Sequence, residues 1–229
     1  MATAQIRKSI CDPWIPFAVI NQQITSNHRI KERKMKVIYR EGKKEDSLHI
    51  AELDNIASDG AIEFLFHDLI PDMTPVQIVA SNFENDRYPH SYRSVIVAEH
   101  DETIIGMSLS FPGKYHKITE EMRNFFPHDR INHFKHFFSA SVEDSYFLDA
   151  LCVDEDFRNR GIGSKLIELT KIKARKEGYN SLCLLVFKDN TIAQKVYKKS
   201  GFDVIDWIDL PSHKLMPHEG GCVLMKAII

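Results

Sequence analysis

The sequence predicts a mixed α/β (α+β) domain built on a mixed, mostly antiparallel, twisted sheet of about six to seven strands flanked by helices. Two observations carry this prediction. Apolar segments at residues 94–99 and 103–111 are separated by a short polar connection, which is typical of an antiparallel hairpin. Residues 146–202 then follow the order strand, helix, strand, helix with short links, which predicts a right-handed parallel crossover.

The elements before the hairpin are predicted to be one strand and three helices. Residues 37–39 form a short strand, and residues 44–57 place apolar side chains at helical spacing. Residues 61–69 and 75–83 read as two further helices, the first of them ended by Pro71. A strand followed by helices therefore opens the domain.

Residues 112–142 interrupt the strand pattern and are predicted to form an irregular or helical insertion. They begin with Pro112-Gly113 and contain four histidines and a dense set of aromatic residues. These side chains are either solvated or packed on one another, or they wall a binding pocket.

The second half of the chain has the most regular pattern. An apolar strand at residues 146–153 is followed by a helix at 162–177, a strand at 181–187 and a helix at 191–200. Two further strand-like segments come after Gly201-Phe202. These strands complete the predicted sheet.

Residues 1–34 differ from the rest because they lack a sustained hydrophobic period and end in a charged run at residues 28–34. They predict a poorly ordered extension or docking arm. Met35 directly precedes a strand, so the alternative is that translation starts there and residues 1–34 are an annotation artefact. The predicted domain is residues 35–229.

Composition excludes several classes of protein. The chain has 30 basic and 32 acidic residues, a net charge of -2, and no apolar stretch long enough for a membrane span. Residues 10–20 are broken by an acid and two prolines, so they do not read as a signal peptide. Four scattered cysteines favour a reducing compartment. We therefore expect a soluble cytoplasmic protein, a monomer or homodimer, that binds neither nucleic acid nor membrane.

A glycine-rich turn at residues 158–165 is the clearest chemical motif. Gly161 and Gly163 precede a helix, where oriented backbone N–H groups and the helix dipole attract an anion. A dinucleotide fingerprint would need a third glycine at Leu166, and the spacing of a P-loop is absent. The turn is therefore predicted to bind an anion that belongs to neither of those ligand classes.

Two linked motifs resemble the GNAT superfamily of acyl-CoA-dependent N-acyltransferases. The first is Arg-x-x-Gly-x-Gly at residues 158–163, after a strand that ends at Val153. The second, at residues 190–202, has an Asn at a helix start, a Tyr seven residues later and then Gly-Phe. The similarity is sharp over residues 146–202, and it implies the family's fold, with a sheet that splays at the strand 146–153.

The resemblance implies that acetyl-CoA is the acyl donor. Backbone N–H groups of the turn would bind the pyrophosphate, aided by the charge of Arg158 or Arg160. The strand would pair with the pantetheine arm, with the N–H of Leu151 or Val153 near the thioester carbonyl. Asn190 would bond a pantetheine amide. The implied donor-binding residues are Leu151, Cys152, Val153, Arg158, Asn159, Arg160, Gly161, Ile162, Gly163, Ser164 and Asn190.

The resemblance also assigns Tyr197 as the general acid that protonates the leaving thiolate. The alternative is a core tyrosine. Asp149 is the only acid in an otherwise apolar strand and is expected to be the base or to act through a water, although a satisfied structural carboxylate fits equally well. The weaker candidates for the base are Asp154, Glu155, Asp156, His218 and Glu219.

The histidines and cysteines raise two further questions: whether a metal site is present and whether any thiol is reactive. His128, His133 and His136 could form a metal site, but no acid or cysteine completes a ligand set at helical spacing, so we predict none. Cys152 and Cys183 lack an adjacent histidine and are expected to be small core residues.

The sequence thus favours an N-acetyltransferase that forms a ternary complex in which an amine attacks the thioester directly. A small-molecule amine is the expected acceptor. The alternatives are a protein N-terminus or lysine, or a non-catalytic acyl-CoA-binding module with residues 1–34 as a partner arm.

Overall fold

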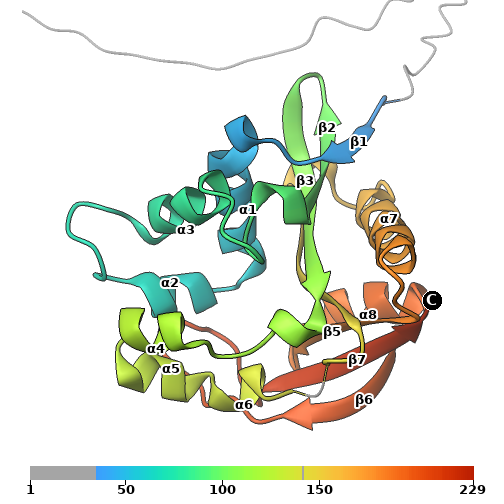
Figure 1. Cartoon of the computed structure of the whole chain (residues 1–229). Coiled ribbons are helices and arrows are strands. Elements are labelled where there is room, and N and C mark those ends of the chain that lie inside the picture. Colours follow the sequence, from blue (N-terminus) through green and yellow to red (C-terminus); the bar gives the residue numbers. More distant parts are fainter. Residues whose placement is uncertain (1–34, 141) are drawn as a thin grey trace, which may run out of the picture. The chain divides into compact units, whose positions relative to one another are not determined.

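The computed structural model describes residues 35–140 and 142–229. The predicted extension at residues 1–34 lies outside these described residues. The described chain forms one sheet with helices on both faces (Figure 1).

The sheet has seven strands in the order β1-β2-β3-β4-β5-β7-β6. Every neighbouring pair is antiparallel except β4 and β5, which are parallel. The prediction of a mixed, mostly antiparallel sheet is therefore confirmed. Its strands are β1 (Ile38–Glu41), β2 (Val95–His100), β3 (Thr103–Pro112), β4 (Tyr146–Val153), β5 (Ser181–Phe187), β6 (Asp203–Ile208) and β7 (Cys222–Ile228).

Helices α1 and α3 lie on one face of the sheet and α7 on the other, while α4 to α6 lie beside α2 (Figure 1). The short helices α4 to α6 fall within the predicted insertion. The helices are α1 (Ser47–Ala57), α2 (Ala61–Phe66), α3 (Pro75–Glu84), α4 (Glu120–Phe125), α5 (His128–His133), α6 (Lys135–Phe138), α7 (Ile162–Lys176) and α8 (Thr191–Lys199).

Helix α2 is shorter than predicted. It ends at Phe66 because His67 takes an extended backbone with ψ 127° and Asp68 takes a left-handed one with φ 53°. The apolar residues that follow therefore belong to a loop, although their spacing looked helical.

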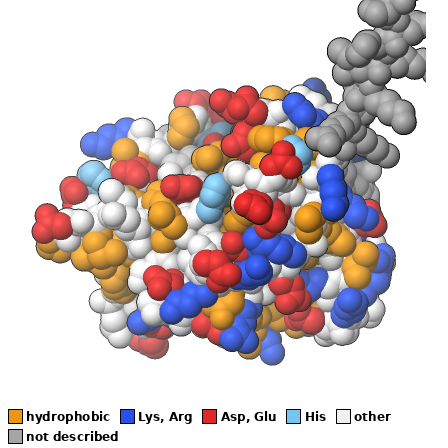
Figure 2. Space-filling view, turned by 90° about the horizontal axis from the view of Figure 1, so that it is seen from above, with side chains coloured by type: hydrophobic (Ala, Val, Ile, Leu, Met, Phe, Trp, Pro, Cys, Tyr) orange, Lys and Arg blue, Asp and Glu red, His pale blue; other side chains and the backbone are white. Residues whose placement is uncertain are grey.

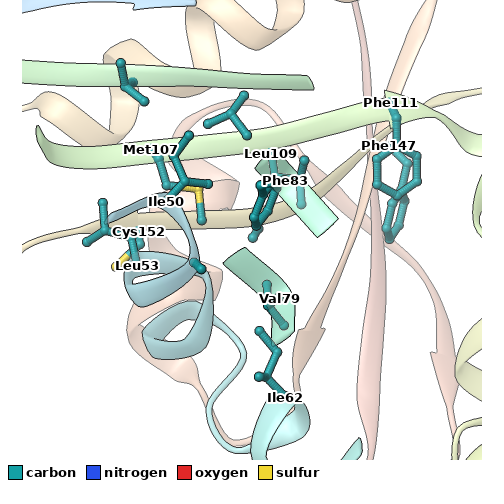
Figure 3. Packing of buried hydrophobic residues seen from close by; sticks show 14 of the residues in the cluster. Ile50, Leu53, Ile62, Val79, Phe83, Met107, Leu109, Phe111, Phe147 and Cys152 are labelled. Carbon is teal, nitrogen blue, oxygen red and sulfur yellow. The ribbon is translucent and has the colours of Figure 1, made fainter. Parts of the chain in front are cut away.

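The main core packs α1 and α3 against β3 and β4 (Figure 3). Ile50 and Leu53 come from α1, and Phe83 comes from α3. Burying a side chain of this size contributes about 1.5–3 kcal/mol, so this layer holds both helices against the strands. The same layer fixes the side of α1 that faces β4.

Strand β4 is paired unequally on its two edges. Along β3 its pairing runs from Tyr146 to Val153, whereas with β5 the described pairs are only Tyr146 with Leu182 and Phe147 with Cys183. Strand β5 instead pairs along its whole length with β7. The sheet therefore splays beyond Phe147, and the β5-facing edge of β4 is left open there.

A β-bulge changes the direction of side chains on β4. The register with β3 passes from Leu148 to Ala150, so Asp149 is the extra residue. Phe147, Ala150 and Cys152 belong to the core shared with α1. Without the bulge, the alternation of side chains along the strand would put Phe147 and Ala150 on opposite faces.

A hydrogen bond joins the two ends of the insertion. The N–H of Gly113 donates to the carbonyl of Ser145 at 2.8 Å. An added Cβ at Gly113 would lie 2.0 Å from the carbonyl oxygen of Val142 and 2.8 Å from that of Ser145. Only glycine fits this junction, which holds the insertion against the sheet.

We expect Gly113→Ala to lower the free energy of unfolding by about 3 kcal/mol, because backbone atoms must move to admit the methyl group. The control is Gly178→Ala, where the Cβ meets open space and only the left-handed φ of +87° is strained. That control should cost about 1 kcal/mol. Urea unfolding measures both, and equal losses would contradict the proposed crowding.

Candidate functional site

One large cavity of about 960 Å³ opens where the sheet splays. It is lined by the turn before α7, the open edge of β4, the start of α8 and the aromatic insertion. The implied donor-binding residues line it with the exception of Arg160, and so do Asp149 and Tyr197. The structure therefore brings the two sequence motifs to one cavity.

The turn before α7 presents backbone donors. Gly161 takes a left-handed backbone with φ 81° and is the N-cap, with no side-chain cap. The first helical bond runs from Lys165 N–H to Gly161 C=O. The N–H groups of Ile162, Gly163 and Ser164 precede that bond, so the helix itself gives them no partner. They lie at the positive end of a 15-residue helix.

The two arginines of the turn differ in placement. Arg158 lines the cavity, and its Nε donates to the carbonyl of Val153 at 2.9 Å, which ties the turn to the end of β4. Arg160 donates to the carbonyl of Asp156 at 3.0 Å and lies over the Phe157 ring at 5.5 Å. Arg158 is therefore the better placed of the two for a bound anion.

Asp149 pairs with a histidine that the sequence analysis missed. Its Oδ2 lies 3.3 Å from Nε2 of His90, and both residues line the cavity. His90 precedes β2, far from both motifs in sequence, so no motif spacing pointed to it. Asp149 is also the extra residue of the β4 bulge.

Asp54 on α1 is a second acid that the sequence analysis missed. It is buried and lines the same cavity. A signal was available, because Asp54 falls on the apolar face of α1, four residues after Ile50. An acid on a buried helix face is costly unless it is bonded or functional.

These three groups influence each other's protonation. Burial and, to a smaller extent, the negative charge of Asp149 raise the pKa of Asp54 to about 7, against the opposing effect of His90. Burial disfavours charged His90, but its bond to Asp149 and the charges of Asp149 and Asp54 outweigh this effect and raise its pKa. Asp54 therefore costs folded-state stability as the pH rises from about 4 to about 7. Such perturbed groups are typical of functional sites.

Tyr197 and Asn190 come from α8. Burial raises the pKa of Tyr197 to about 12, so its hydroxyl is protonated at neutral pH, and its ring packs on Phe202 at 5.8 Å. The side-chain oxygen of Asn190 accepts from Ala193 N–H at 3.1 Å as the cap of α8. Its amide nitrogen lies 3.5 Å from Asp59 Oδ2.

His218 contacts two aspartates that lie on different loops, Asp189 and Asp59. Its Nδ1 lies 2.6 Å from Asp189 Oδ1, and its Nε2 lies 3.1 Å from Asp59 Oδ2, though not in hydrogen-bond geometry. The ring stacks on Phe187 at 4.0 Å. The N–H of Glu219 donates to Asp189 at 3.0 Å. These contacts indicate a structural role for His218.

The remaining acidic candidates lie at the end of β4. Asp154 caps the short turn of residues 155–157 by accepting from Asp156 N–H at 3.0 Å. Neither Asp154, Glu155 nor Asp156 is among the cavity-lining residues.

Among the described residues, no group of three or more His, Cys, Asp or Glu side chains is arranged to hold a metal ion. Burial raises the pKa of Cys152 to about 11, and the pKa of Cys183 is raised for the same reason. Both thiols are buried, as expected for core residues. In the part of the chain that is described, no helix combines the length and apolar character needed to cross a membrane.

The family model described as acetyltransferase (GNAT) family matches residues 62–202. A curated relative, the chloroplastic GCN5-related N-acetyltransferase 6 of Arabidopsis thaliana, is 30% identical over 60 residues, 26% of this chain and 21% of that protein. The match thus spans about a fifth of that relative's length.

Solved structures share the fold. An acetyltransferase has a TM-score of 0.62 and 24% identity over 84% of this chain and 99% of its own. The Staphylococcus aureus Mu50 N-acetyltransferase has a TM-score of 0.62 and 20% identity over 83% and 100%. The Drosophila melanogaster polyamine N-acetyltransferase, which forms N-acetylagmatine, has a TM-score of 0.59 and 16% identity over 85% and 100%. Since the family model covers more than half of the chain, this protein belongs to the acetyltransferase (GNAT) family.

Proposed function

We propose that the protein transfers an acetyl group from acetyl-CoA to a primary amine by direct attack within a ternary complex. The observation that carries the proposal is a single cavity that joins the α7 N-terminus, the open edge of β4, the Asp149–His90 pair and Tyr197. Each of these features suits a different part of the reaction.

The described residues fit an acyl-CoA. N–H groups of Ile162, Gly163 and Ser164 suit a pyrophosphate, with Arg158 beside them. The open edge of β4 beyond Phe147 offers backbone groups to an extended, amide-bearing arm. The N–H of Leu151 or Val153 would stabilise negative charge on the thioester oxygen. The thioester supplies an activated acyl carbon.

The reaction balances with the groups present. The acceptor first loses one proton to solvent and becomes a neutral amine. The lone pair of its nitrogen then forms a bond to the acyl carbon, and the bond between that carbon and sulfur breaks. The amine proton passes to the base, and the thiolate takes a proton from Tyr197. Proton exchange with solvent then restores both groups.

His90 is the proposed base, oriented by Asp149 at 3.3 Å. A neutral imidazole that donates its Nε2–H to Asp149 carries its basic lone pair on Nδ1. Asp54 acts as a positioning residue, because its negative charge favours the protonated imidazole. This proposal moves the base from Asp149 to its partner.

The proposed acceptor is a small-molecule amine, with a protein N-terminus or lysine as the alternative. Acidic and basic side chains are interspersed over the face seen in Figure 2, which gives no support for a nucleic-acid partner. A reducing, cytoplasmic location is part of the proposal, and the buried free thiols are compatible with it.

The donor site predicts a loss of binding without a loss of fold. Gly163→Glu should abolish the rise in melting temperature that acetyl-CoA gives the parent, because a carboxylate at a helix start repels phosphate but suits the helix dipole. An added Cβ at Gly163 meets Val153 at an ordinary 3.7 Å. Gly178→Glu, beyond the far end of α7, is the control and should keep the shift. A retained shift in Gly163→Glu would refute this site.

Tyr197→Phe should lower kcat by about 100-fold and leave the Kd for acetyl-CoA nearly unchanged, because only the acid hydroxyl is lost while the ring still packs. Tyr179→Phe, a tyrosine outside the cavity, is the matched control. Steady-state kinetics and calorimetry measure the two quantities. Unchanged turnover would remove Tyr197 from the mechanism.

The base predicts a specific pH dependence. His90 must be neutral to accept a proton, and its pKa is raised, so kcat/KM should fall as the pH drops through a midpoint above 6.5. Asp149→Asn removes the group that raises this pKa, so the fall should move to lower pH. Asp203→Asn, on the exposed start of β6, is the control. Every variant is assayed with the same amine, so the ionisation of that amine affects all pH profiles equally and does not change the difference between them. An unmoved profile in Asp149→Asn would exclude the pair.

A further inference from the structure

The part of the cavity lined by α2 and the insertion, whose helices lie away from α7 in Figure 1, has an aromatic wall. Phe66 and Phe126 meet edge to face with centroids 5.0 Å apart, and Phe137 and Phe138 lie 5.4 Å apart. His116 is buried against Phe147 at 4.1 Å, and burial lowers its pKa, so this ring is neutral. The wall therefore offers rings without charge.

The mouth of this end is also apolar but exposed. Tyr88 is 51% exposed, Tyr115 39% and Phe125 44%, and all three line the cavity. Helix α4, which carries Phe125, has no buried residue. Exposed aromatic side chains gathered at a cavity mark a surface that an apolar group covers.

Charge is distributed unevenly along the cavity. Asp54 and Asp149 lie together near His90. The charged lining residues within four sequence positions of Tyr88, Tyr115 or Phe125 are Arg87, Lys117 and Glu121, a net +1. Glu121 is already paired, with its Oε1 3.0 Å from Arg87. One ammonium group finds acids beside His90, whereas a second one beside Tyr115 and Phe125 meets net positive charge.

We propose that the acceptor is a primary amine that carries a single positive charge on an apolar body, an alkyl chain or an aromatic ring. This inference rests on the proposed acetyl transfer and specifies its acceptor. The amine reaches the Asp149–His90 pair while the body covers the aromatic wall. Polyamines and lysine-containing peptides are poor acceptors on this account, since each places further polar or charged groups at the mouth.

A matched pair of amines tests the class. Hexylamine and 1,6-diaminohexane have the same length and differ by one terminal ammonium group. We expect kcat/KM for hexylamine to be at least about tenfold higher, although the diamine has two reactive ends, because the second ammonium group of the diamine loses hydration and meets the net positive charge of Arg87, Lys117 and Glu121. An equal or better diamine, or a better lysine peptide, would overturn the inference.

Two substitutions test which part of the cavity produces the preference for hexylamine over the diamine. Lys117→Glu reverses one charge at the mouth and should narrow the ratio of kcat/KM for hexylamine to that for the diamine by threefold or more, through KM. Lys176→Glu, at an exposed position of α7, should leave this ratio unchanged. Phe125→Ala should raise KM for hexylamine by about tenfold. Trp207→Ala, which removes an aromatic side chain 64% exposed on β6, should leave it unchanged. No change in the Lys117 and Phe125 variants would contradict the placement.

Calorimetry of acetyl-CoA binding to each variant separates the two levels of the argument. If acetyl-CoA binds and a diamine or peptide is acetylated best, the proposed function stands and the acceptor class is wrong. If acetyl-CoA does not bind and none of these amines is acetylated, the proposed function fails. Hexylamine binding can also be measured by NMR under conditions without turnover, which tests the apolar site independently of catalysis.

Discussion

The unequal pairing of β4 is the constraint on which the rest of the site depends. One edge of β4 pairs with β3 from Tyr146 to Val153. The other edge pairs with β5 at only two positions, and β5 instead pairs along its length with β7. The open edge, the cavity and the approach of α7 and α8 to it all follow from that divergence. Backbone groups left unpaired inside a protein are costly. An extended ligand with amides of its own would satisfy them.

The β4 bulge adds the second requirement, which is chemical. It interrupts the register at Asp149, whose carboxylate meets His90. Asp54 lies near this pair on α1, a helix that Ile50 and Leu53 hold against the sheet (Figure 3). A buried acid therefore occupies a position on the apolar face of α1, close to this pair. The cost in stability above pH 4 suggests that the acid is retained for function.

The sequence predicted the strands around the site well because the apolar pattern of residues 146–153 and 181–187 is long and bounded by turn residues. Local motifs also placed the α7 turn, Asn190 and Tyr197 at one cavity. His90 escaped prediction because its role depends on a contact across 59 residues and on a bulge that no local pattern encodes. Asp54 could have been noticed on the apolar face of α1. The end of α2 was misplaced because the backbone turns at His67 and Asp68 despite an apolar spacing.

Hydrogen exchange of backbone amides tests the central claim most directly, since that claim concerns which N–H groups hold the donor. The account predicts that acetyl-CoA slows exchange at Ile162, Gly163 and Ser164 and at one or both of Leu151 and Val153, while amides of the β2–β3 hairpin keep their rates. Protection confined to other segments, or none at all with acetyl-CoA bound, would contradict it.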